Sequence, residues 1–170
     1  MLARPAGTGR ADEAALRHVV RAAPGLTVLT GGQTGVDTIA VHAALGAGLP
    51  VHVVFPLGLR QEDGSLTPAR RRRLAGAIAH ELGSASFRHR TWTCVDVADA
   101  VLLQPAAGAA SADHVARWLA EAAARVVMVA GCRASVLARQ AGADRGVRAD
   151  MTEVIAGAAD WHGRLLRGGN

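Results

Sequence analysis

The sequence contains no lysine and no tyrosine, and only two of its 170 residues are cysteine. A P-loop NTPase is excluded, because its loop needs a lysine after the last glycine, and here Val36 follows Gly35. The two cysteines, Cys94 and Cys132, lie far apart and lack CxxC spacing. This excludes a zinc knuckle and a disulfide framework, so we expect two reduced thiols in or near the core.

Aromatic residues are scarce, and they do not alternate with basic residues as in proteins that stack nucleic-acid bases. The five are Phe55, Phe87, Trp92, Trp118 and Trp161. The net charge of +5 and the run Arg70–Arg73 would suit a nucleic acid. Because every positive side chain other than histidine is arginine, we interpret the charge as compositional and the run as the solvated face of a helix. We therefore expect no nucleic-acid partner.

No hydrophobic run is long enough to span a bilayer, and residues 1–10 combine glycines, a proline and charges without an apolar block. The sequence thus predicts a soluble, cytoplasmic protein with no secretory signal and no membrane partner. With half of its residues hydrophobic, the chain can bury one ordinary core but not two comfortably. We expect a flexible N-terminus at 1–10 and a single domain over 11–170.

Apolar runs alternate with amphipathic segments, which is the pattern of a parallel sheet covered by helices on both faces. The predicted strands are 26–30, 51–55, 100–103 and 126–130. The first predicted helix begins at Asp12 and ends before Pro24. Five further helices are predicted over residues 36–45, 69–82, 113–124, 134–140 and 151–166. In the 69–82 helix, Leu74 and Ile78 are expected to face inward; 56–68 is read as a long loop and 84–90 as a polar turn. The fold class is α/β: a Rossmann-like, doubly wound, mainly parallel sheet.

The segment Thr27–Asp37, TVLTGGQTGVD, joins an apolar strand to the start of a helix through a glycine loop. Its three glycines allow a sharp turn and close approach of a ligand. The unpaired N–H groups and partial positive charge of the helix end favour a phosphate, and Gln33 and Thr34 could add donors. The motif predicts either anion binding or, more simply, a turn that only reverses the chain.

A second loop, PLGLRQEDG at Pro56–Gly64, is densely charged. Arg60 could clamp a phosphate or a carboxylate. Glu62 and Asp63 could accept from ribose hydroxyls, hold a hydrated Mg²⁺ or serve as a general base. The alternative is a surface loop held together by its own ion pairs.

Ligands of parallel sheets bind beyond the carboxyl ends of the strands, where the connecting loops gather. The loops expected to leave those ends are 31–35, 56–64 and 104–111. A further cationic cluster precedes the third predicted strand and consists of Arg88, Arg90 and Thr91. No group of histidines has metal-ligand spacing, so we expect no metal centre.

GGQTGVD at Gly31–Asp37, PLGLRQEDG, the pair Arg90 and Thr91 and the VDVADAVLL that follows together resemble the molybdenum cofactor carrier family. That family belongs to the SLOG superfamily of Rossmann-like nucleotide binders, which includes the cytokinin-activating phosphoribohydrolases. The resemblance covers about residues 26–104 and implies a site for the molybdenum cofactor or a nucleotide. The binding residues that it implies are Gly31, Gly32, Gln33, Thr34, Gly35, Asp37, Arg60, Arg90 and Thr91.

The chain departs from the family after the third strand. Relatives usually present a second glycine-rich loop there; in this chain Gly108–Ser111 is either a degenerate copy, or the loop is deleted together with a strand and a helix. Cys94, Val97 and Ala98 also replace polar residues of the family. From these changes we expect weaker binding of a phosphate at the position of the second glycine-rich loop.

Three functions remain open from the sequence. The first is binding of a phosphorylated small molecule. The second is hydrolysis of the N-glycosidic bond of a nucleoside monophosphate by Glu62 or Asp63, although the PGGxGTxxE loop of the phosphoribohydrolases is absent. The third is a scaffold with a degenerate site, and a homodimer or higher homo-oligomer is expected. The candidate residues for the interface of this oligomer lie on the terminal helix and are Val154, Ile155, Trp161 and Leu165.

Overall fold

A five-stranded, wholly parallel sheet forms the centre of the protein, with strand order β5-β2-β1-β7-β6. The computed structural model describes residues 9–104, 112–131, 133–137 and 143–168. The sheet strands are β1 (Thr27–Thr30), β2 (Val51–Phe55), β5 (Ile78–Glu81), β6 (Ala100–Gln104) and β7 (Val126–Gly131). A separate two-stranded hairpin pairs β3 (Arg60–Gln61) with β4 (Gly64–Ser65). The predicted Rossmann-like α/β fold is confirmed.

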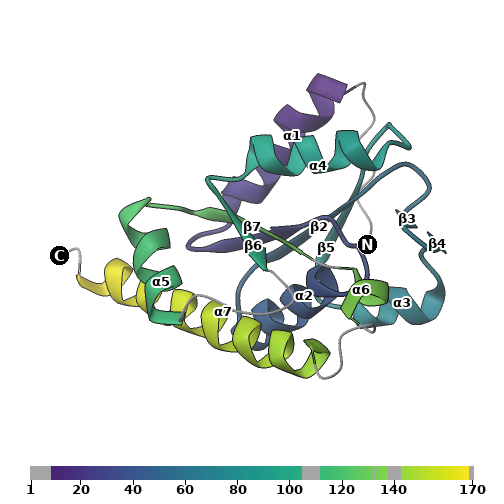
Figure 1. Ribbon diagram of the computed structural model, residues 1–170. Coiled ribbons are helices and arrows are strands. Elements are labelled where there is room, and N and C mark those ends of the chain that lie inside the picture. Colours follow the sequence, from purple (N-terminus) through teal and green to yellow (C-terminus); the bar gives the residue numbers. More distant parts are fainter. Residues whose placement is uncertain (1–8, 105–111, 132, 138–142, 169–170) are drawn as a thin grey trace.

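Helices cover both faces of the sheet (Figure 1). One face carries α1 (Gly9–Ala22) and α4 (Phe87–Val97); the other carries α2 (Val36–Gly46), α5 (Ala112–Glu121) and α7 (Ala143–Gly168). Two short helices, α3 (Pro68–Arg73) and α6 (Ala134–Leu137), follow β4 and β7. No helix in the described ranges has the length and apolar character needed to cross a bilayer.

The sheet divides the core into two clusters, because successive side chains of a strand point to opposite faces. On β1, Val28 packs into the larger cluster, under α2, α5 and α7, and Leu29 into the smaller one, under α1 and α4. Val53 and Val54 of β2 divide in the same way. This two-sided burial explains why the central strands read as continuous apolar runs in the sequence.

Two histidines are buried side by side on neighbouring strands. His52 of β2 and His80 of β5 are 1% and 5% exposed, and their rings stack with 5.1 Å between centroids. Nδ1 of His52 lies 2.8 Å from Nε2 of His80, so one imidazole donates and the other accepts. Burial lowers the pKa of both, to about 4 for His80. Both rings are therefore neutral at pH 7.

The predicted helix over 69–82 is confirmed only as far as Arg73 and is wrong beyond it. Helix α3 ends at Arg73, and the chain then forms β5, which pairs with β2. Gly76 has φ +100°, a conformation that ends a helix. Ile78, expected to face inward from a helix, lies on this edge strand and is 47% exposed.

Three further boundaries differ from the prediction. The polar turn at 84–90 is instead largely the start of α4, capped by the Ser86 hydroxyl, which accepts from the His89 N–H. The predicted loop 56–68 contains the β3–β4 hairpin. Helix α7 begins at Ala143 instead of after Asp150.

The terminal helix does not offer Val154 and Ile155 to a partner subunit, because both are 3% exposed and belong to the core of this chain. The side chains of Trp161 and Leu165 fall outside the described part of the structure, as do Gly108–Ser111 and Cys132. The other predicted thiol, Cys94, is buried and reduced.

Candidate functional site

The glycine loop between β1 and α2 is shaped by what packs against it. Gly32 has φ +67°, and a Cβ there would lie 2.5 Å from Phe55 Cε1 and 2.6 Å from Val53 Cγ1. A Cβ on Gly31 would overlap the guanidinium of Arg90. Gly35 has φ +85° at the start of α2. The first two glycines are therefore required by close packing of the protein against itself, and Gly32 by its backbone conformation as well.

Two side chains from the first turn of α2 form hydrogen bonds with the backbone of the loop. The Gln33 N–H donates to Asp37 Oδ2 at 3.1 Å, and the Thr38 hydroxyl donates to the Gln33 carbonyl at 3.0 Å. Asp37 is 4% exposed. Burial raises the pKa of Asp37 to about 6, although the Gln33 N–H and the Arg90 guanidinium act in the opposite direction.

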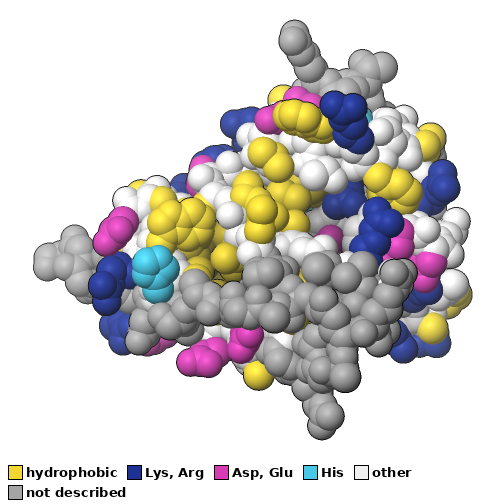
Figure 2. All heavy atoms as spheres, viewed as in Figure 1, with side chains coloured by type: hydrophobic (Ala, Val, Ile, Leu, Met, Phe, Trp, Pro, Cys, Tyr) yellow, Lys and Arg dark blue, Asp and Glu magenta, His cyan; other side chains and the backbone are white. Residues whose placement is uncertain are grey.

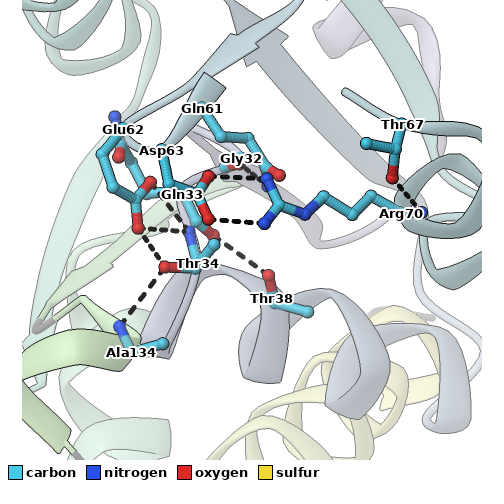
Figure 3. Close-up of polar contacts among 10 residues, drawn as sticks. All are labelled: Gly32, Gln33, Thr34, Thr38, Gln61, Glu62, Asp63, Thr67, Arg70 and Ala134. Carbon is cyan, nitrogen blue, oxygen red and sulfur yellow. Dashed lines mark hydrogen bonds and ion pairs between the residues drawn. The ribbon is translucent and has the colours of Figure 1, made fainter. Parts of the chain in front are cut away.

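The next residue of the loop is bound by a carboxylate from the hairpin (Figure 3). The Thr34 N–H lies 3.2 Å from both carboxylate oxygens of Glu62, and the Thr34 hydroxyl also donates to Glu62. In the orientation that satisfies both ends of its amide, the Gln33 side chain donates to Glu62 and accepts from Arg90 Nη2 at 2.7 Å. Gln61, beside Glu62, donates from Nε2 to the Gly32 carbonyl at 2.7 Å.

Arg90 reaches the loop from the other face of the sheet. It extends from α4, is 4% exposed and lies against Gly31. One turn further on, burial raises the pKa of the Cys94 thiol to about 12. A thiol with such a pKa is not a nucleophile at neutral pH, so Cys94 is a packing residue.

A cavity of about 600 Å³ opens beside the start of α2. It is lined by Thr34, Gly35, Thr38, Gln61, Glu62, Asp63, Arg70, Arg73, Leu74, Arg133, Ala134, Ser135 and Arg148. Four arginines and two carboxylates thus meet at a helix N-terminus. Basic and acidic side chains also lie next to one another on the right-hand side of the face drawn in Figure 2.

Arg70, one of these arginines, forms an ion pair with Asp63. Arg70 Nη1 donates to Asp63 Oδ1 at 2.6 Å, and Nη2 donates to Oδ2. This two-pronged hydrogen bond lowers the pKa of Asp63 and raises that of Arg70. The loop is therefore partly held by an ion pair to Arg70 of α3, whereas the sequence interpretation expected ion pairs within the loop itself. No group of three or more potential metal ligands occurs among the described histidine, cysteine, aspartate and glutamate residues.

The structure brings most, but not all, of the predicted site residues together. The glycine loop residues, Asp37, Glu62 and Arg90 converge at the ends of β1 and β2, and Asp63 lines the cavity. Arg60 lies apart: it is exposed, and its guanidinium carbon is 5.9 Å from the ring centroid of Phe87. Thr91 is exposed too, and its hydroxyl donates to the Phe87 carbonyl of its own helix.

Seven polar lining residues were not among the predicted site residues: Thr38, Gln61, Arg70, Arg73, Arg133, Ser135 and Arg148. A signal existed for some of them. Arg70 and Arg73 belong to the arginine run that follows the EDG segment, and Arg133 comes shortly after the carboxyl end of β7. Polar residues that follow the carboxyl end of any strand of a parallel sheet are candidate site residues, and this holds for β7 as much as for β1 and β2.

The fold and the loop together define a Rossmann-like α/β protein with a cavity at the strand ends. Residues 28–108 match the model of the "Circularly permutated YpsA SLOG family", so the resemblance to the SLOG superfamily is confirmed. No curated protein matches the chain significantly. Among solved structures, a "Putative molybdenum carrier protein" from Syntrophus aciditrophicus SB is similar, with 17% identity and a TM-score of 0.59. The alignment covers 78% of this chain and 93% of that one.

Proposed function

We propose that this protein binds a phosphorylated small molecule, a nucleotide or a molybdenum-cofactor-like ligand, in the cavity beside α2. The observation that carries the proposal is the meeting of four arginines with the N-terminal turn of a helix. They are Arg70, Arg73, Arg133 and Arg148, and they come from three separate segments of the chain. Guanidinium groups and a helix N-terminus both favour phosphate.

The size and position of the cavity support a ligand larger than a free anion. A volume of about 600 Å³ falls in the range of small-molecule sites, roughly 300–1,000 Å³. It also lies at the carboxyl ends of β1 and β7, where α/β sheets bind ligands. The likeness to a molybdenum carrier protein favours a molybdenum-cofactor-like ligand, and the SLOG resemblance favours a nucleotide.

A thermal-shift screen with nucleoside mono- and diphosphates and phosphorylated pterins tests the proposal. A ligand present at 100 times its Kd should stabilise the protein by about 2.7 kcal/mol, which is a shift of several degrees. Arg73→Ala should reduce the shift. Arg72→Ala is the matched control, since Arg72 has the same charge on the same helix and is not part of the cavity lining.

Two results would count against binding in this cavity. One is the absence of any concentration-dependent stabilisation by the whole ligand set. The other is an equal response of the wild type and Arg73→Ala to a ligand that does bind. The second result would move the site elsewhere on the protein.

The hydrolase alternative rests on Glu62, which lines the cavity. Its carboxylate accepts hydrogen bonds from Thr34, and the neighbouring Asp63 is held by Arg70. Neither is free to activate water in this arrangement, so we propose binding ahead of hydrolysis. Incubation with nucleoside monophosphates, followed by chromatography for the free base, separates the two: release of base by the folded protein would establish the hydrolase.

A further inference from the structure

The carboxylate of Glu62 is bound by the glycine loop at the start of α2. Both of its carboxylate oxygens lie 3.2 Å from the Thr34 N–H, and the Thr34 hydroxyl donates to one of them. The Gln33 amide donates to the other. The loop thus surrounds one carboxylate with a backbone donor and two side-chain donors. A phosphate on a glycine loop is bound by donors of the same kinds.

From this contact we infer that Glu62 is an internal competitor, which fills the anion position of the loop until a phosphate group displaces it. The inference rests on the proposed function and adds a form of regulation to it. Both groups are anionic acceptors that need the Thr34 N–H and hydroxyl, so they exclude each other. Ligand affinity is then lowered by the free energy needed to release Glu62 from its donors.

The surroundings of Glu62 do not suit the other roles of a carboxylate. A metal ligand or a general base needs a free lone pair directed at the ion or proton. Here the oxygens are directed at the donors of Thr34 and Gln33. The Glu62 carboxylate is therefore held like a bound anion and not like a general base or a metal ligand.

The hairpin can keep its place when Glu62 leaves. Gln61 anchors it to the loop through its own hydrogen bond to the Gly32 carbonyl, and Asp63 anchors it to Arg70. Glu62 itself is only partly buried and lines the cavity. A rotation of this one side chain toward the cavity would expose the Thr34 donors without moving the backbone. Arg73 and Arg133, which also line the cavity, provide positive charge near the displaced carboxylate.

The test is a titration of the full chain with inorganic phosphate, in which binding is monitored through the ¹H–¹⁵N chemical shifts of the Gln33 and Thr34 amides. Glu62→Gln keeps the size of the side chain and removes its charge, and Glu62→Ala removes the competitor. Both should bind phosphate at least about tenfold more tightly than the wild type. Glu121→Gln, the matched control, makes the same charge change at an exposed position at the end of α5. It should change the affinity less than about twofold.

The inference is overturned if the Glu62 variants bind phosphate with wild-type or weaker affinity, if they bind none, or if binding leaves the Thr34 amide unmoved. These outcomes are separate from failure of the proposed function, which is judged by the response of the wild type to nucleotides and phosphorylated pterins. A wild type that binds such a ligand, with no gain in the Glu62 variants, would retain the function and remove the competitor.

Discussion

The charge on Asp37 should control how the stability of the protein depends on pH. This carboxyl is 4% exposed at the start of α2, and burial raises its pKa to about 6 from the ordinary 3.8. Replacing it by asparagine keeps the shape and an acceptor for the Gln33 N–H, but removes the titration. The comparison of wild type with Asp37→Asn therefore isolates one group from all the others.

The sign and size follow from linkage. A group whose pKa is raised by folding adds stability below its unfolded pKa of 3.8, and loses that addition as the pH rises through 6. The shift of about two pKa units corresponds to roughly 3 kcal/mol. His80 acts in the opposite sense: its pKa falls to about 4 on folding, so its contribution is complete above 6.5 and is lost toward pH 4. In the wild type the two effects nearly cancel between pH 4 and 6.5.

Urea denaturation followed by circular dichroism, from pH 4.5 to 7.5, measures the difference. Asp37→Asn should lose about 2 kcal/mol more than the wild type as the pH falls over this range, because pH 4.5 lies above the unfolded pKa and most, but not all, of the contribution is developed there. Asp96→Asn, the same change at an exposed position of α4, is the control and should parallel the wild type. Parallel curves for Asp37→Asn would refute burial as the dominant influence. A smaller acid loss than in the wild type would show that the Arg90 charge outweighs burial.

Three other substitutions test the packing around the site and sheet. Gly31→Ala should lower the free energy of unfolding by about 2–4 kcal/mol and weaken ligand-induced stabilisation, because its Cβ would displace Arg90. Gly46→Ala is the control: its Cβ would meet no atom within 4 Å, so in the same urea assay it should be neutral or slightly stabilising. Asp99→Ala should cost about 1–2 kcal/mol, since its carboxylate accepts from two backbone N–H groups at 2.9 Å; an unchanged urea midpoint would contradict this. Phe55→Ala, at a fully buried position, should cost about 3–5 kcal/mol in a thermal melt, and a loss below 1 kcal/mol would show that the loop does not pack on it.

Three of the four strands that sequence reasoning found, β1, β2 and β7, are central strands buried on both faces, and the fourth, β6, is an edge strand that is nevertheless an apolar run. β1 and β2, for example, are apolar runs whose residues are all buried, and burial of that kind leaves a signal in the sequence. Their adjacency in the sheet also made the convergence of the glycine loop with Glu62 predictable, because parallel neighbours end at the same edge.

β5 was missed because its sequence satisfies two patterns at once. Leu74 and Ile78 are four residues apart, which suits a helix face, yet Ile78 lies on an edge strand with an exposed side chain. Only the pairing with β2 decides between the two, and that pairing is a contact between distant segments. Gly76 was the local warning, since a glycine at that point can end a helix.

The side-chain contacts of the site were less predictable than its location. Arg90 was expected to bind a ligand, but it lies buried against Gly31 and supports the loop from the opposite face. Arg73 lies on the exposed face of α3, as interpreted, and it also lines the cavity, which the sequence did not indicate. A sequence shows which charges are available at the strand ends, whereas only the packing shows which of them are already paired.

The glycines of the loop therefore do not by themselves indicate a ligand. Gly31 leaves room for Arg90, and Gly32 leaves room for Phe55, so both would be required in a protein that bound nothing. The loop N–H groups of Gln33 and Thr34 are also satisfied within the chain. A substitution of Gly32 would consequently disturb the fold whether or not the site functions, and it cannot separate a binding protein from a scaffold. The discriminating changes are at Arg73, which lines the cavity without holding the loop, and at Glu62, whose removal should strengthen binding if the loop accepts phosphate.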